Sequence, residues 1–123
     1  MAEPKYLEDP AYRCLRVEDI DGYEMAIINR PEVDFTDANL RSVDLRKADL
    51  EKVILKGAYL RDADLRGCDL RHMDLEGTSF HNAKVAGAYF PYNVHAPELE
   101  MSIVHGTRIR TAPPMDPEGA EEG

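Results

Sequence analysis

The sequence predicts an all-β fold in which the chain coils around one column of apolar side chains. Apolar residues recur at every fifth position over a long central stretch, a period that neither an α-helix nor a single β-strand has. A mostly small residue precedes each apolar centre by two positions, which is the spacing that places two side chains on one face of an extended segment. The two positions after each centre are mostly charged, glycine or short polar residues, which suit a turn.

Twelve consecutive five-residue units run from residue 33 to residue 92 without an insertion. The central side chain of each unit is expected to point inwards and to form the structural core. These centres are Phe35, Leu40, Leu45, Leu50, Leu55, Leu60, Leu65, Leu70, Leu75, Phe80, Val85 and Phe90.

The residue just before the centre is usually Asp or Asn. The side chains of these residues can accept hydrogen bonds from nearby backbone N–H groups, so we expect them to hold the corners of the coil. In five units another residue takes this outward position, and those units give the surface its individual character. They carry Ile54, Tyr59, Ser79, Lys84 and Tyr89.

Units that read small, Asp or Asn, Leu, polar, polar resemble the repeats of the pentapeptide-repeat family. The resemblance covers residues 33–92, about half of the chain. It implies a right-handed quadrilateral β-helix in which four units complete one coil. Twelve units then make about three coils, with a height of about 15 Å at the usual strand spacing.

The open ends of a short coil need caps, because they expose unpaired backbone groups. Residues 1–32 are expected to form an N-terminal flank and cap. The alternation of Tyr23, Met25 and Ile27 predicts at least one strand in this cap.

Residues 93–110 are expected to form a C-terminal cap or a partial coil. A hairpin around His105 and Gly106 is the alternative for part of this segment. Residues 111–123 are rich in Pro, Gly and Glu, and they are expected to form a disordered acidic tail.

The formal net charge of −9 lies mainly in the flanks. Residues 33–92 hold 10 acids and 9 bases, whereas the segments before and after them have a net charge of −4 each. A nucleic-acid ligand is therefore not expected. Within the repeats, Arg41 stacks over Arg61 and Arg46 over Arg66 at a spacing of 20, and a phosphate-binding stripe is the alternative to an ordinary solvated charge ladder.

No motif of an enzyme, a metal site or a cofactor site is present in the sequence. The four histidines lack the spacing of metal ligands, and there is no phosphate-binding glycine loop or nucleophile elbow. We therefore expect no catalytic residue, no metal and no cofactor. Cys14 and Cys68 have no CxxC spacing and are expected to be free thiols of a cytoplasmic chain. Neither a membrane span nor a secretory signal is expected.

The function that the sequence favours is a structural or protein–protein interaction module with an unidentified protein partner. Aromatic and aliphatic residues at outward positions suggest where that partner binds. A homodimer through a coil end or through a patch of Ile54 and Tyr59 is a further arrangement that the sequence allows. The candidate partner-binding residues are Ile54, Tyr59, Tyr89 and Tyr92.

The resemblance implies an alternative function. Some longer family members resemble duplex DNA in shape and charge and protect type II topoisomerases from quinolones. A DNA-mimicking inhibitor or protector of gyrase, which confers antibiotic resistance, is therefore the second hypothesis. It fits this chain less well, because the repeats are nearly neutral and about 15 Å tall, whereas one turn of DNA is about 34 Å long.

Overall fold

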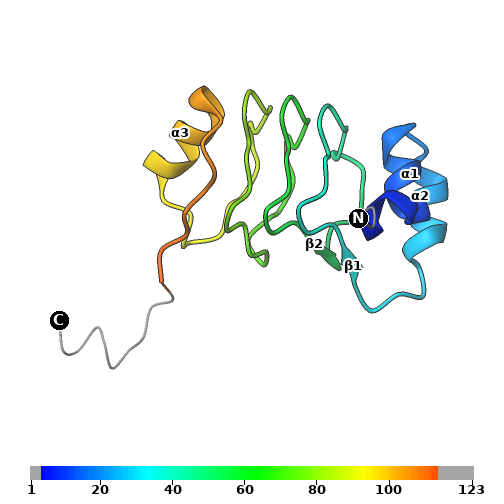
Figure 1. Cartoon of the computed structure of the whole chain (residues 1–123). Coiled ribbons are helices and arrows are strands. Elements are labelled where there is room, and N and C mark those ends of the chain that lie inside the picture. Colours follow the sequence, from blue (N-terminus) through cyan, green and yellow to red (C-terminus); the bar gives the residue numbers. More distant parts are fainter. Residues whose placement is uncertain (1–3, 114–123) are drawn as a thin grey trace.

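The computed structural model describes residues 4–113, and it places helices at both ends of the repeats. Figure 1 shows the coiled central part between α1 and α2 at one end and α3 at the other. The prediction of an all-β fold is therefore wrong for the flanks. In chain order the elements are the 3₁₀-helix η1 (Lys5–Glu8), α1 (Pro10–Arg16), α2 (Ile20–Ile27), β1 (Val33–Asp34), β2 (Val53–Ile54) and α3 (Ala96–His105).

The central part pairs with itself in parallel at an offset of 20 residues. Val33 of β1 lies opposite Val53 of β2, and five isolated parallel bridges have the same offset. Each five-residue unit therefore lies beside the unit four places further along the chain. The outward residues of these pairings define four ladders: ladder A with Asp34 and Ile54, ladder B with Asn39, Tyr59 and Ser79, ladder C with Asp44, Asp64 and Lys84, and ladder D with Asp69 and Tyr89.

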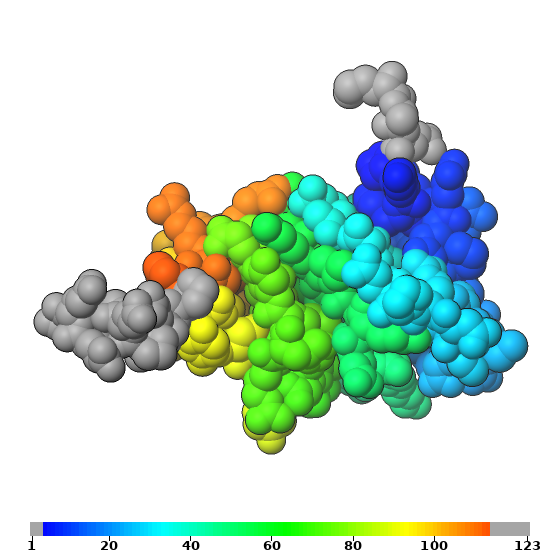
Figure 2. All heavy atoms as spheres, turned by 90° about the horizontal axis from the view of Figure 1, so that it is seen from below, coloured from blue at the N-terminus to red at the C-terminus, as the bar shows by residue number. Residues whose placement is uncertain are grey.

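The apolar centres form the core of the protein. Ten of the twelve are buried, and the last two, Val85 and Phe90, are half-buried. The ring of Phe90 packs edge-on against that of Phe80, with 5.5 Å between the ring centroids. Figure 2 shows the successive turns of the repeat following one another in colour order, from the N-terminal helices to the C-terminal segment.

Side chains of Asp and Asn hold the corners, as the sequence predicts. In all seven units that have one of these residues before the centre, its side-chain oxygen accepts a hydrogen bond from the backbone N–H two residues later. This bond closes a local turn without using a backbone acceptor. The seven residues are Asp34, Asn39, Asp44, Asp49, Asp64, Asp69 and Asp74.

At most corners, the residue two positions after the centre has a positive φ and so adopts the left-handed backbone conformation. Its N–H then points to the next turn of the chain, as in the 3.0 Å bond from Gly67 to the carbonyl of Ala86. Only glycine and short polar residues take this conformation at little cost. The residues concerned are Asp37, Ser42, Gly57, Asp62, Gly67, Gly77, Asn82 and Gly87, with φ between 56° and 75°.

The corners at Lys47, Lys52 and His72 depart from this pattern. None of the three has a positive φ. Within residues 4–113, no bridge pairs position 49 with position 69 or position 54 with position 74. The pairing between successive turns is therefore open at these two places, although β1 and β2 pair with each other just after Lys52.

The N-terminal cap is helical, so the strand predicted through Tyr23, Met25 and Ile27 is wrong. Tyr23 and Ile27 are buried and Met25 is 72% exposed, which is the pattern of one face of a helix with residues four apart. Asp19 starts α2 by accepting a hydrogen bond from the N–H of Gly22, and Asp9 caps α1 in the same way.

Two buried tyrosines of this cap satisfy carbonyl groups at the start of the repeats. The hydroxyl of Tyr12 donates to the carbonyl of Asn39 at 2.6 Å, and that of Tyr23 donates to the carbonyl of Asp49 at 2.7 Å. Burial raises the pKa of the Tyr23 hydroxyl, which keeps it a donor. The first turn of the repeats therefore has protein partners in place of water.

The C-terminal cap consists of α3 and an extended strap of residues 107–112. The hairpin alternative is wrong, because residues up to His105 are helical and Gly106, with φ 76°, ends the helix. Arg108 then pairs antiparallel with Ser79, and Ile109 is completely buried. The backbone of Gly77 donates to the carbonyl of Ile109 at 2.8 Å.

The boundary predicted for the acidic tail also needs a correction. Thr111 donates to the carboxylate of Glu76 and Ala112 to the carbonyl of Asn93, each at 2.8 Å. These two residues therefore belong to the strap. Residues 114–123 of the predicted disordered tail lie outside the described residues.

Replacing a buried centre should destabilise the protein strongly. Leu65 has no exposed surface, so we expect Leu65→Ala to lower the free energy of unfolding by about 2–5 kcal/mol. Urea denaturation followed by circular dichroism measures this. Val85→Ala, at a half-buried centre, should cost less. A loss below about 1 kcal/mol for Leu65→Ala would contradict its place in the core.

The contact between α3 and the last turn of the repeats can be tested at Ser102. Its buried hydroxyl accepts a 2.8 Å hydrogen bond from the backbone N–H of Phe80. Ser102→Ala leaves this buried N–H without a partner, so it should cost about 1–3 kcal/mol in urea denaturation. Val104→Ala, at an exposed position of the same helix, should change stability by about 0.5 kcal/mol or less. Equal effects of both variants would show that the hydrogen bond adds nothing.

Candidate interaction surface

The four candidate partner-binding residues lie on different parts of the surface. Ile54 is half-buried on ladder A, and Tyr59 is 41% exposed on ladder B. Tyr89 is 57% exposed on ladder D, and Tyr92, at the end of the last unit, is 69% exposed. They do not form one common patch, and each has different neighbours.

Tyr59 is the middle residue of ladder B. It bridges Asn39 on one side and Ser79 on the other, and Ser79 in turn pairs with Arg108 of the strap. The guanidinium carbon of Arg108 lies 4.6 Å from the centroid of the Tyr59 ring. The same guanidinium donates to the carbonyl of Gly77 at 3.1 Å. Arg108 is thus fixed over the aromatic ring by a backbone contact and a cation–π contact.

A hollow of about 310 Å³ opens beside Tyr59. Tyr6, from η1, contributes a second aromatic ring, which packs edge-on against Tyr12 with 4.8 Å between centroids. The result is an aromatic floor with basic side chains next to it. We call this region the Tyr59 surface; its residues are Tyr6, Asp37, Asn39, Arg41, Tyr59 and Arg61, which line the hollow, and Arg108.

Tyr89 has a similar arginine contact in different surroundings. The guanidinium carbon of Arg71 lies 4.9 Å from the centroid of its ring. Asp69 holds the same guanidinium through two hydrogen bonds of 2.9 Å each. The donors of Arg71 that form this fork are therefore already used within the protein.

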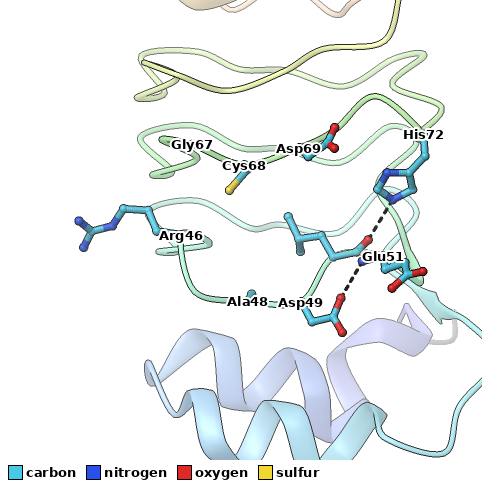
Figure 3. A pocket seen from close by; sticks show the side chains of 9 residues that line it. Arg46, Ala48, Asp49, Glu51, Gly67, Cys68, Asp69 and His72 are labelled. Atoms are coloured by element: carbon cyan, nitrogen blue, oxygen red, sulfur yellow. Dashed lines mark hydrogen bonds between the residues drawn. The ribbon is translucent and has the colours of Figure 1, made fainter.

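A second hollow, of about 400 Å³, lies where ladder D is open. Figure 3 shows His72 reaching across it, and the ring Nε2 of His72 is 3.3 Å from the carbonyl oxygen of Leu50. Asp49, Glu51 and Asp69 also line this hollow. Lys47 and Lys52, two corners without a positive φ, flank the lining segment 48–51.

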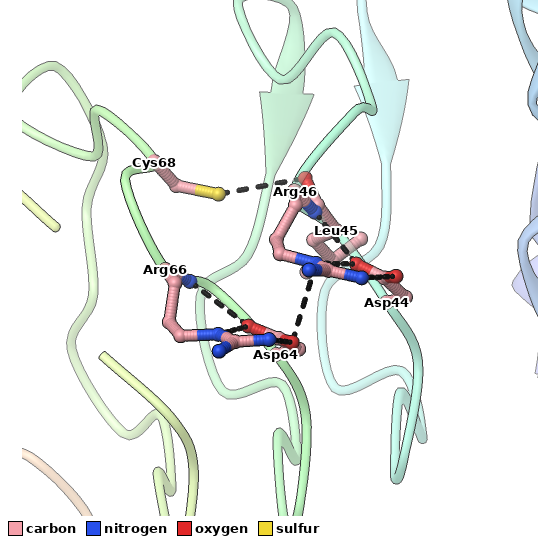
Figure 4. A network of polar contacts seen from close by, with 6 residues as sticks. All are labelled: Asp44, Leu45, Arg46, Asp64, Arg66 and Cys68. Atoms are coloured by element: carbon pink, nitrogen blue, oxygen red, sulfur yellow. Dashed lines mark hydrogen bonds and ion pairs between the residues drawn. The ribbon is translucent and has the colours of Figure 1, made fainter. Parts of the chain in front are cut away.

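Ladder C carries a network of ion pairs, which Figure 4 shows. Arg46 is hydrogen-bonded to both carboxylate oxygens of Asp44, at 3.0 and 2.7 Å. Its Nε also lies 3.2 Å from Asp64, which itself holds Arg66. These aspartates therefore offset the charge of the stacked arginines. Since these guanidinium groups are already paired, the alternative of a phosphate-binding stripe has little support on this ladder.

The network also affects the titration of its carboxylates. Hydrogen bonds from Arg66 lower the pKa of Asp64 from 3.8 to about 2, and Arg46 lowers the pKa of Asp44 in the same way. The nearby thiol of Cys68 is buried and lies 3.4 Å from the carbonyl oxygen of Leu45. Burial raises the pKa of Cys68, so its thiol stays protonated at neutral pH and is a poor nucleophile.

The repeats are nearly neutral as a whole, but positive and negative side chains are unevenly distributed among their ladders. Residues 38–47, 58–67 and 78–87, which carry ladders B and C, hold six bases and three acids, a net charge of +3. The rest of residues 33–92 holds three bases and seven acids, a net charge of −4. The stacking of units 20 residues apart therefore gathers positive charge on ladders B and C.

Two kinds of site were not found in residues 4–113. No group of three or more His, Cys, Asp or Glu side chains there is arranged to hold a metal ion. Within the same residues, every helix is too short or too polar to cross a bilayer.

Asp64→Asn should make stability less sensitive to acid. The folded-state pKa of about 2 lies below the ordinary value of 3.8, so ionised Asp64 stabilises the fold above about pH 4 and this contribution is lost towards pH 2. Urea unfolding of wild type and variant across this range should give a smaller change for Asp64→Asn. Asp21→Asn, at an exposed position of α2, is the control. Equal slopes for wild type and Asp64→Asn would contradict the role of the ion pairs.

Comparison with known proteins identifies the repeats. The family model described as pentapeptide repeats matches eight copies over residues 31–57 and 58–90. Neither the curated proteins nor the solved structures contain a match to this chain. The match covers nearly all of the twelve units described above. Through these repeats, the chain belongs to the pentapeptide-repeat family.

Proposed function

We propose that the protein is a non-catalytic module that binds a protein partner through the outer surface of its repeats. The observation that carries this proposal is that the chain covers both ends of its own repeats. Tyr12 and Tyr23 bond to carbonyl groups at one end, while Phe80 and Asn82 donate to α3 at the other. The surfaces left for another molecule are then the lateral ladders.

The scaffold of this module is, in our proposal, a right-handed quadrilateral β-helix of three coils. The 20-residue offset of the parallel pairs supports four units per coil, and residues 33–92 hold twelve units. Such a scaffold keeps surface side chains at fixed spacings, which reduces the entropy lost when a partner binds.

Several features of the described residues support a role without catalysis. The recurring aspartates are used in corners and ion pairs, and the buried thiol of Cys68 has a raised pKa. The hollows are open at the surface and are shaped by the corners of the repeat. The aspartates and Cys68 therefore have structural roles.

The gyrase hypothesis draws less support from the geometry. A DNA mimic needs a long acidic surface, but the net charge of +3 on ladders B and C gives this protein a basic region. The helices at both ends also cover the coil edges through which two molecules would stack into a longer rod. We therefore place a protein partner other than a topoisomerase first.

Affinity capture tests the proposed function. The tagged full-length protein is immobilised and exposed to a lysate of the organism that encodes it, and bound proteins are identified by mass spectrometry. We expect at least one protein to be enriched about tenfold or more over resin that carries heat-denatured protein, because binding needs the folded ladders. Equal recovery on both resins would contradict the proposal.

A gyrase assay separates the two hypotheses. The purified protein is added to a supercoiling reaction that a quinolone inhibits. We expect supercoiling to stay inhibited. Restored supercoiling would favour the topoisomerase hypothesis over the one proposed here.

A further inference from the structure

We propose that the Tyr59 surface is the docking site of the protein partner, and that its occupant is an acidic segment of that partner with an apolar side chain placed in the hollow. This inference rests on the proposed function, because it names the surface and the chemistry of the ligand for the same module. It differs from the expectation drawn from the sequence, which grouped Tyr59 with three residues that lie elsewhere.

The arginines of ladder B are free to bind, whereas those of the other ladders are already paired. On ladders C and D, an Asp before the centre holds the Arg that follows the centre, as in Asp64 with Arg66 and Asp69 with Arg71. On ladder B, Asn39 and Tyr59 take the position of this Asp. The side chains of Arg41 and Arg61 therefore lack such a partner.

The contacts of Arg41, Arg61 and Arg108 show that these side chains have donors left for a ligand. Within residues 4–113, the guanidinium of Arg41 makes no hydrogen bond or ion pair. Arg61 has one contact, 3.7 Å from a carboxylate oxygen of Asp62, and that carboxylate accepts a 2.6 Å bond from Asn82. Arg108 uses Nη1 for the carbonyl of Gly77. Each guanidinium thus keeps donors that can meet a carboxylate.

The hollow supplies the apolar part of the site. The rings of Tyr59 and Tyr6 line it, and both tyrosines are held by neighbours, Tyr59 by Arg108 and Tyr6 by Tyr12. Rigid aromatic residues provide contact area at a small entropic cost, and Tyr and Arg are the residues enriched at the centres of interfaces. One carboxylate, that of Asp37, also lines the hollow, which leaves the three arginines in excess.

Ladder B, like ladder C, is paired through three successive units, and it continues to Arg108 of the strap. Backbone bonds of 2.8–3.0 Å join Ala38 and Leu40 to Tyr59, and Ala58 and Leu60 to Ser79. Ladder D is open at the corresponding place. A surface that is already rigid loses less entropy on binding, so ladder B is the better docking platform.

Charge selects the class of partner. The Tyr59 surface is a basic region on a chain of net charge −9. A nucleic acid carries dense negative charge along its length and would meet the acidic flanks as well. A protein segment with a few carboxylates can match the three arginines without a long run of negative charge, and we therefore assign the site to a protein.

Fluorescence anisotropy tests this assignment. The probe is a short fluorescein-labelled peptide of glutamates around one central leucine, added to the full-length protein at low salt. Tyr59→Ser and Arg61→Glu should each weaken binding about tenfold or more. Serine occupies the equivalent position 79 of the same ladder, so Tyr59→Ser should fold, which circular dichroism checks. Tyr89→Ser and Arg71→Glu are matched controls, because they remove the other arginine–tyrosine contact; they should change affinity by about twofold or less.

The outcomes separate the docking site from the proposed function. No binding of the peptide, equal loss in the Tyr89→Ser control, or tighter binding of a thymidine oligonucleotide than of the peptide would overturn the assignment. If affinity capture recovers a partner equally well with wild type, Tyr59→Ser and Arg61→Glu, the module still binds a protein but not through this surface. Loss of that partner from both variants, with full recovery by Tyr89→Ser, would support the assignment.

Discussion

The structure depends on one requirement: the chain must turn after every five residues and still pair its backbone with the unit 20 residues away. Two local interactions meet it. The Asp or Asn before the centre accepts the N–H two residues later, and a left-handed residue after the centre directs its own N–H to the next turn. Near Lys47, Lys52 and His72, which lack this conformation, position 49 does not pair with position 69 and position 54 does not pair with position 74. The apolar centres stabilise the interior, but the corners decide which residues of successive turns pair with each other.

The caps follow from the same requirement at the ends of the coil. A repeat that stops exposes carbonyl and N–H groups that the next turn would have paired. Here the flanks supply those partners with different groups at the two ends. Tyrosine hydroxyls reach the carbonyls of the first turn, whereas a serine hydroxyl and backbone carbonyls meet the N–H groups of the last. The strap also donates the N–H of Ile109 to the carbonyl of Thr78, so each cap supplies partners for the backbone edge that it covers.

The Tyr59 surface arises from a change in the corner chemistry. An Asp before the centre stabilises a corner and also neutralises the Arg that follows it. When Asn39 and Tyr59 take this position, the turn is kept but the arginines become available. The asymmetry between ladders therefore comes from substitutions at positions that the fold tolerates. A repeat protein can in this way change its binding surface while its interior stays constant.

The sequence by itself determined the period, the twelve centres and the corner aspartates, because these depend on interactions between residues that are close in the chain. It also placed Tyr59 among the candidate residues. It did not reveal the helical caps, since the alternation of Tyr23, Met25 and Ile27 is equally consistent with residues four apart on a helix. Only the tertiary structure shows that Tyr6 and Arg108, which lie outside the repeats, are neighbours of Tyr59. Their approach depends on how the flanks pack against the ends of the coil, and no local pattern of residues encodes such long-range contacts.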